Sequence, residues 1–527
     1  MSEEEKVPVR QLILVGIAVL LTGILLIVKP SHSVFQVNKT INIMDAKVGD
    51  FGNPTKTVKS GDLWVDYDKN MIPVAFDNSG QTVRADETNT DSTYYWFDYC
   101  QNTSSGSYNY KASGCEFRWA NAVLVSDTNR ETYKSASPGT LITESDILAY
   151  LVYVPRFKYQ LWNANDGTST VQTINIEFEN KTTTPSCGGN ACTTNRIYKT
   201  GSNGLMLTHP AFTFGTTELN GLWVGKFEVS PDEASACYTE SSPTNCSDTA
   251  GTAITPRIKP NKKSWIRANI ATLYTVSQYF KSKPMYGIDT STVDSHMMKN
   301  MEWGAVAYLS QSIYGKRGYD GTEIYANPSS ISDYVAGRGA VTPSGGGGMY
   351  SYDGKNCNIM SGDECAGMQQ SVYGMASSTT GTIYGIYDMS GGTFDHVMGN
   401  MVDSIKLTAP GPIYSNASGF DGTTYKYPES KYYDSYDNGT TYNDATAFAR
   451  GYLGDATKET LTCLNSSECG WNSNMSVFVG MGSFCWFLRG GLYAGAPQTL
   501  LGVWSFTYSN NGGGPVMGSF RPTLVVE

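Results

Sequence analysis

The chain has 527 residues, which is enough for about three or four domain-sized units and for a large core. Its formal net charge is −10 and no basic stripe is present, so the composition argues against nucleic acids as partners. Only 16% of residues are charged while Gly (55) and Tyr (35) are abundant, a balance typical of loop-rich extracellular domains.

The N-terminal region contains one long apolar run. Residues 12–28 (LILVGIAVLLTGILLIV) carry no charge, and as a helix they would span about 26 Å, enough for a thin bilayer. Lys6 and Arg10 precede the run and favour a cytoplasmic N-terminus. A cleaved signal peptide is the alternative, although no A-x-A-like site follows. The sequence therefore predicts a cytoplasmic tail (1–11), a single-pass membrane anchor (12–28), a stalk (29–61) and an extracellular body.

Ten of the eleven cysteines fall into sequence-local couples around Gly/Ser/Asn-rich stretches. This spacing predicts loops closed by disulfides in an oxidising compartment. The predicted pairs are Cys100–Cys115, Cys187–Cys192, Cys237–Cys246, Cys357–Cys365 and Cys463–Cys469. Zinc ligation is the alternative, but no histidine lies at zinc-finger spacing from a cysteine couple. The remaining residue, Cys485, is flanked by aromatics and is expected to be a small buried hydrophobe.

Residues 62–140 are predicted to form a small β-rich module. Aromatic and β-branched runs alternate there with Asp/Asn/Ser/Gly clusters, as in short antiparallel strands. The expected strands are residues 63–67, 71–76, 94–99 and 117–124. Trp64, Trp96 and Trp119 either form a platform on which a sugar stacks or pack as buried cross-strand aromatics.

A larger domain is expected from residue 141 to residue 527. Residues 143–146 resemble a helix N-cap before a short turn, and residues 151–157 a strand. Apolar residues recur at helical spacing over residues 265–281 and 297–309, which predicts two helices. Two loop regions, around residues 344–348 and 425–469, are expected to be surface insertions.

Five blocks in this domain resemble, in the same order, motifs of the sulfatase-modifying-factor or formylglycine-generating-enzyme family. They are HPAF (209–212) leading to GLWVGKFEV (221–229), NMEWGAVAY (300–308), YGIYDMSGG (384–392), LRGG (488–491) and GSFRP (518–522). The resemblance implies an α+β C-type-lectin-like fold, a twisted antiparallel sheet with two helices and long loops. Within the blocks, Trp223, Trp303, Tyr387, Arg489 and Arg521 are expected to serve the core and its polar ties.

The family's oxidase activity is not expected here. Its formylglycine-generating members bind copper through two cysteines shortly after the "R-G-G-S" block, whereas residues 490–527 contain no cysteine. This sequence also departs from the family's calcium-binding motif at residues 391–395, which leaves only Asp388 and Asp395 as weak calcium candidates. No H-E-x-x-H, P-loop or nucleophile elbow occurs elsewhere. We therefore expect a protein that is not an enzyme and requires no cofactor.

The same fold carries the variable proteins of diversity-generating retroelements, which this C-terminus resembles in outline. Strand alternation over residues 503–509 places the aromatics on one face and small polar residues on the other. The residues expected to bind a protein or glycan ligand are Tyr493, Gln498, Ser505, Thr507, Ser509, Asn510 and Asn511. A structural component of a surface layer or appendage, in which these loops contact neighbouring copies, is the alternative function.

Overall fold

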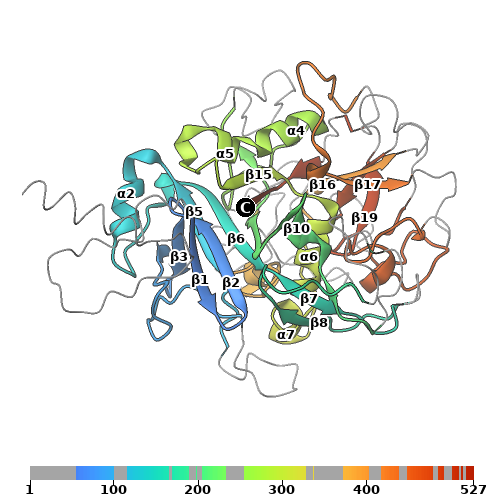
Figure 1. Cartoon of the computed structure of the whole chain (residues 1–527), viewed down its shortest axis with the longest axis horizontal. Coiled ribbons are helices and arrows are strands. Elements are labelled where there is room, and N and C mark those ends of the chain that lie inside the picture. Colours follow the sequence, from blue (N-terminus) through green and yellow to red (C-terminus); the bar gives the residue numbers. More distant parts are fainter. Residues whose placement is uncertain are drawn as a thin grey trace, which may run out of the picture. The chain divides into compact units, whose positions relative to one another are not determined.

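A seven-stranded antiparallel sheet organises the described part of the chain (Figure 1). The structure is a computed structural model that describes residues 55–99, 115–164, 169–188, 198, 204–232, 254–327, 336–337, 372–402, 417–437, 448–478, 485–491, 501–509, 512–513 and 518–527. In spatial order, the strands are β15 (Val293–Met297), β21 (Pro522–Val526), β12 (Gly221–Gly225), β6 (Ile147–Pro155), β5 (Asn121–Val125), β3 (Ile72–Phe76) and β4 (Thr82–Arg84). Strand β6 is an apolar run buried along its whole length, as expected for a strand covered on both faces.

A second, five-stranded sheet lies in the C-terminal part and mixes parallel with antiparallel pairs. Its strands are β16 (Phe394–Val402), β17 (Asp434–Asp437), β18 (Trp486–Arg489), β19 (Phe506–Ser509) and β20 (Gly518–Phe520). Smaller sheets pair β1 (Thr55–Ser60) with β2 (Leu63–Asp68), β10 (Thr213–Phe214) with β11 (Thr217–Glu218), and β13 (Ser230–Pro231) with β14 (Pro256–Arg257). A three-stranded sheet joins β8 (Asn175–Phe178), β7 (Phe157–Gln160) and β9 (Leu207–Thr208).

The helices are short, and α6 (Asn300–Ser310) is buried at every residue. Gly304 allows this packing, because a Cβ there would lie 1.9 Å from the Gly454 carbonyl oxygen. The other α-helices among the described residues are α2 (Asp127–Ser135), α4 (Ile270–Ser277), α5 (Tyr279–Ser282), α7 (Lys316–Asp320) and α8 (Val372–Ala376). The described 3-10 turns are η2 (Glu144–Asp146), η3 (Pro210–Phe212), η4 (Pro284–Tyr286), η7 (Ser430–Tyr432), η8 (Lys458–Thr460) and η9 (Trp471–Ser473).

Both predicted helices exist, but each begins later than the apolar spacing indicates. The first begins at Ile270, because Arg267 has a left-handed φ of 63° and Asn269 caps the helix by accepting from the Thr272 N–H at 2.9 Å. The second begins at Asn300, because the residues up to Met297 pair in strand β15.

The structure corrects the predicted fold class. A C-type-lectin-like domain starting near residue 141 and preceded by a separate β-rich module was expected. Instead, β3, β4 and β5 continue the sheet that contains β6 and β12, and residues Pro54–Glu527 form one unit. The architecture is mixed α/β with more residues in strands than in helices. Two smaller expectations also fail: strand β1 occupies the end of the predicted stalk, and residues 94–99 make only isolated bridges.

The predicted membrane topology is also corrected. No helix in the described part of the chain is long and apolar enough to cross a bilayer. The apolar run at residues 12–28, which carried the single-pass prediction, lies outside the described residues.

The disulfide prediction is confirmed at Cys463–Cys469, whose Cα atoms are 5.0 Å apart. Cys115 and Cys187 are also disulfide-bonded, but their predicted partners Cys100 and Cys192 lie outside the described residues. All four cysteines of the predicted pairs Cys237–Cys246 and Cys357–Cys365 also lie outside the described residues. The expectation for Cys485 is met, because its side chain is buried and burial raises the pKa of its thiol to about 11.

Candidate functional site

The residues expected to line a C-terminal ligand surface are only partly described. Tyr493, Gln498, Asn510 and Asn511 lie outside the described residues, as does the side chain of Ser509. Thr507 is half-buried in β19. Ser505 is fully buried. Its N–H donates to the Gly502 carbonyl oxygen at 2.9 Å and closes a turn just before the strand begins. The structure therefore places Ser505 in the interior, away from the described surface.

Residues of the family-like blocks lie in the interior. Trp223, Trp303, Tyr387, Arg489 and Arg521 are all fully buried. Their polar groups form hydrogen bonds within the protein. The Trp303 indole N–H donates to the Val503 carbonyl oxygen at 2.9 Å, and the Arg489 guanidinium donates to the Asn300 side chain at 3.0 Å. These contacts confirm the expected role of the five residues in the core.

The two weak calcium candidates are both buried and bonded within the protein. Asp388 accepts hydrogen bonds from the Asn327 amide at 2.8 Å and from the Gly337 N–H at 2.9 Å. Asp395 pairs through one carboxylate oxygen with the Arg521 guanidinium at 2.9 Å, and its other oxygen has no hydrogen-bond partner among the described residues. Among the described residues, no group of three or more His, Cys, Asp or Glu residues is placed to hold a metal ion.

Burial governs the protonation of this interior cluster. Burial, reinforced by the nearby Asp395 and Asp388 carboxylates, raises the pKa of Glu228 well above its usual range. Burial also raises the pKa of Asp388 to about 6. Thr393 and Ser264 hydroxyls donate to the Glu228 carboxylate, so its oxygens are already used. The cluster therefore has the properties of an internal hydrogen-bonded support.

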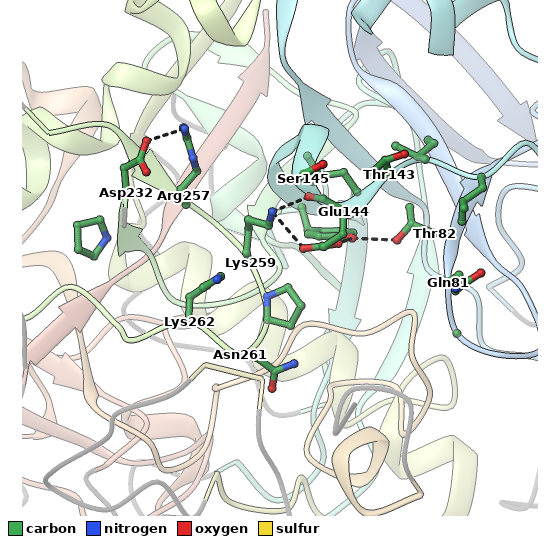
Figure 2. Close-up of a pocket in the computed structure, with 17 residues that line it drawn as sticks. Gln81, Thr82, Thr143, Glu144, Ser145, Asp232, Arg257, Lys259, Asn261 and Lys262 are labelled. Atoms are coloured by element: carbon green, nitrogen blue, oxygen red, sulfur yellow. Dashed lines mark hydrogen bonds and ion pairs between the residues drawn. The ribbon is translucent and has the colours of Figure 1, made fainter. Parts of the chain in front are cut away.

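An open pocket lies elsewhere, where the edge strand β4, the turn η2 and the segment after β14 meet (Figure 2). Its volume is about 790 Å³, within the range of small-ligand sites. The lining includes exposed polar residues, buried hydroxyls and one exposed aliphatic side chain. The residues are Gly80, Gln81, Thr82, Leu141, Ile142, Thr143, Glu144, Ser145, Ile147, Tyr150, Pro231, Asp232, Arg257, Lys259, Pro260, Asn261 and Lys262.

Backbone hydrogen bonds hold the pocket walls in place. The Tyr150 N–H donates to the Ile258 carbonyl oxygen at 3.0 Å, which fixes the segment after β14 along the central strand β6. On the opposite wall, the Ile142 N–H donates to the Thr82 carbonyl oxygen at 2.9 Å. Regular strands therefore support both walls, so the side chains between them are preorganised.

Charged side chains inside the pocket are arranged in two ion pairs. In Figure 2, Lys259 lies between Arg257 and Glu144, and its ammonium is 3.2 Å from the Glu144 carboxylate. Arg257 binds Asp232 at 2.8 Å. With Lys262, the lining has three cations and two carboxylates, a local excess of one positive charge on a chain of net charge −10. The excess positive charge of the lining favours polar ligands that carry an anionic group.

Hydroxyl groups supply neutral contacts at the pocket floor. The Tyr150 hydroxyl donates to the Glu144 carboxylate and lies 2.9 Å from the Thr82 hydroxyl. Burial, together with the Glu144 charge, raises the pKa of Tyr150 well above its usual range, so the phenol stays protonated. Leu141, with half of its surface exposed (50%), adds an apolar contact at the rim.

Two carboxylates belong to the pocket lining, and both are engaged in ion pairs. Glu144 and Asp232 are partly exposed, with 55% and 30% of their side-chain surfaces accessible, and each binds a cation. Donors and acceptors for binding are abundant in this lining.

The sequence predicted none of this pocket, because its lining comes from four segments far apart in the chain. No protein-family model matches the chain, and no curated protein matches it either. Any function must therefore be argued from the chain's own residues.

Proposed function

We propose that this protein is a non-catalytic glycan-binding protein and that the pocket in Figure 2 is its binding site. The observation that carries this proposal is the lining, where hydroxyls, side-chain amides and both signs of charge surround one exposed leucine. A saccharide presents many hydroxyl groups, each able to donate and accept, on a ring with C–H faces. The lining offers the complementary groups.

An acidic saccharide is the favoured ligand class. The excess positive charge and the position of Lys259 match a carboxylate or sulfate group, which forms charge-assisted hydrogen bonds with ammonium donors. Thr143, Ser145 and Asn261 are exposed around the pocket and are available to the hydroxyls of the same ligand. Both carboxylates of the lining are held in ion pairs, which supports binding without turnover.

The test is binding of the full chain to an array of neutral, uronic-acid-containing and sulfated oligosaccharides, followed by calorimetric titration of the strongest acidic hit. Lys259→Ala should weaken affinity about tenfold, because it removes a charge-assisted contact. Lys158→Ala is the matched control, since Lys158 is also a surface lysine paired with a single glutamate, at 2.7 Å. Failure of every oligosaccharide to bind, or equal affinity of the two variants, would contradict the proposal.

Turnover is tested on the same complex. The bound oligosaccharide should be recovered with unchanged mass after prolonged incubation with the protein. Appearance of cleaved products that disappears in a Glu144→Gln variant would overturn the non-catalytic part of the proposal.

A further inference from the structure

One tryptophan of this protein is placed differently from the rest. Eight of the ten tryptophans are buried and Trp64 is half-buried with the Lys59 ammonium over its ring. Trp162, two residues beyond the end of β7, keeps 55% of its surface exposed, although Leu161 beside it is fully buried. Burying such a side chain would normally stabilise a protein by about 1.5–3 kcal/mol or more, so exposed tryptophans often mark binding surfaces.

Trp162 is held firmly in this exposed position. Its backbone N–H donates to the Gln172 side-chain oxygen at 2.6 Å, and the Gln172 amide donates back to the Trp162 carbonyl oxygen. The six-membered ring lies against Gly204, where a Cβ would be 2.9 Å from the Cζ3 atom. Gly204 has a φ of +73°, so the position favours glycine for both space and backbone conformation.

Side-chain amides surround the tryptophan. The Gln160 amide donates to the Gly204 carbonyl oxygen at 2.8 Å, and Asn175 donates to the Gln160 side-chain oxygen at 3.0 Å. Asn175 itself is exposed, so its remaining amide groups face solvent. The hydrogen-bonded set around Trp162 thus combines one exposed indole with three uncharged amides.

The size of the apolar patch favours a small ligand over a protein. Two other exposed hydrophobics adjoin these residues in the chain: Val171, at 38% exposure, precedes Gln172, and Leu205, at 39%, follows Gly204. With a whole tryptophan contributing up to about 250 Å², the three side chains together expose only a few hundred Å². A stable protein interface needs about 800 Å² on each partner.

We propose that Trp162 anchors a second glycan-binding surface, separate from the pocket in Figure 2. A pyranose ring stacks its C–H face on the indole, while a hydroxyl group at its edge binds the exposed side-chain amide of Asn175. The inference rests on the proposed glycan-binding function for its ligand class, but it stands on different residues. The described residues that are hydrogen-bonded around Trp162 are uncharged, which indicates a neutral saccharide here, in contrast to the acidic one expected at Lys259.

Tryptophan fluorescence of the full chain provides the test. Acrylamide quenching should report mainly on Trp162, because the buried tryptophans are shielded. Saturation with a neutral gluco-, manno- or chito-hexasaccharide should reduce quenching, and Trp162→Ala should weaken binding of that hexasaccharide about tenfold. Trp162→Phe, which keeps an aromatic face, should stay within about threefold of wild type. Tyr427→Ala, which alters another exposed aromatic (37%), should bind as wild type does.

The outcomes separate the two sites. If Trp162→Ala binds every hexasaccharide as wild type does, or if none of the hexasaccharides binds, the second surface is refuted, whatever happens at the pocket. If Lys259→Ala leaves acidic oligosaccharide binding intact while Trp162→Ala abolishes neutral binding, the pocket proposal fails and the second surface stands. A variant whose urea midpoint matches that of wild type establishes that lost binding is not lost folding.

Discussion

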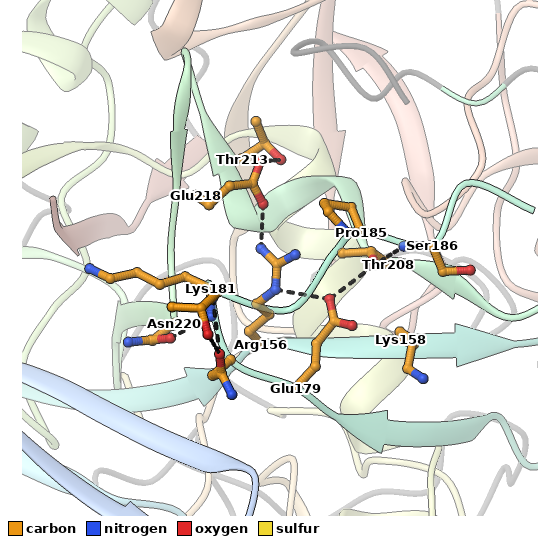
Figure 3. Close-up of polar contacts among 12 residues, drawn as sticks. Arg156, Lys158, Glu179, Lys181, Pro185, Ser186, Thr208, Thr213, Glu218 and Asn220 are labelled. Atoms are coloured by element: carbon orange, nitrogen blue, oxygen red, sulfur yellow. Dashed lines mark hydrogen bonds and ion pairs between the residues drawn. The ribbon is translucent and has the colours of Figure 1, made fainter. Parts of the chain in front are cut away.

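The buried ion pair of Arg156 gives a sharp stability prediction (Figure 3). Arg156 follows the central strand β6 and is fully buried, with its Nε atom 2.9 Å from the Glu179 carboxylate, which is 3% exposed. A second pair reaches the partly exposed Glu218. Glu179 also accepts from the Thr208 hydroxyl at 2.9 Å, so without the arginine that hydroxyl would be the only hydrogen-bond donor left to it among the described residues.

Arg156→Met should lower the free energy of unfolding by about 3–5 kcal/mol, because it leaves an uncompensated buried carboxylate. The double variant Arg156→Met/Glu179→Met should recover most of this loss, since no buried charge remains. Lys158→Met is the control two residues away. Lys158 pairs with Glu177 at 2.7 Å, but 25% of the lysine side chain and 56% of the glutamate side chain are exposed, so the loss of unfolding free energy should stay below about 1 kcal/mol.

Urea unfolding followed by far-ultraviolet circular dichroism measures these differences. The loss in Arg156→Met should also shrink at low pH. Burial already raises the pKa of Glu179 while Arg156 opposes the rise, so without the arginine the carboxyl is protonated more readily. Equal losses for Arg156→Met and Lys158→Met, or a double variant less stable than the single one, would refute the reasoning.

Three further stability predictions concern two titratable side chains and the described disulfide. Burial raises the pKa of Asp434 to about 6, so the contribution of this carboxyl to stability is present below about pH 4 and is lost as pH rises through 6. In urea titrations, the unfolding free energy of Asp434→Asn should exceed that of wild type by up to about 3 kcal/mol at pH 7.5 and by little at pH 4. Burial lowers the pKa of His396 to about 3, and neither ring nitrogen has a hydrogen-bond partner among the described residues, so the protein loses stability as pH falls below about 6.5. The stability of His396→Leu relative to wild type should therefore be about 2 kcal/mol greater at pH 5 than at pH 7.5. An equal difference at both pH values would contradict this. Cys463→Ser/Cys469→Ser should lower the unfolding free energy by about 2 kcal/mol, and an unchanged melting curve would argue against the disulfide's contribution.

Local patterns in the sequence predicted the local structure well. The alternating and apolar runs at residues 63–67 and 71–76 became β2 and β3, and the helical spacing near residue 300 became α6. The helix boundary near residue 265 was wrong because the apolar spacing continues through Arg267, whose left-handed backbone ends any helix there. The N-cap residue Asn269 was the signal that would have placed the start correctly.

Long-range contacts were beyond a single sequence. Nothing local indicates that β5 pairs with β6, and this pairing merges the predicted small module into the main sheet. The sugar-stacking alternative for Trp96 and Trp119 was wrong for the same reason, because both are buried by distant segments. The pocket around Lys259 likewise forms only when residues near 81, 144, 232 and 259 meet. Trp162 is different: a tryptophan within the polar stretch WNANDGTS was a local signal of exposure.

Calorimetric titration of the full chain with an acidic oligosaccharide, repeated for Lys259→Ala and Lys158→Ala, tests the central claim most directly. Saturable binding that weakens about tenfold in Lys259→Ala, weakens with added salt and is unchanged in Lys158→Ala is the result we predict. Absence of binding, or the same affinity in both variants, would contradict the assignment of the pocket as a glycan site.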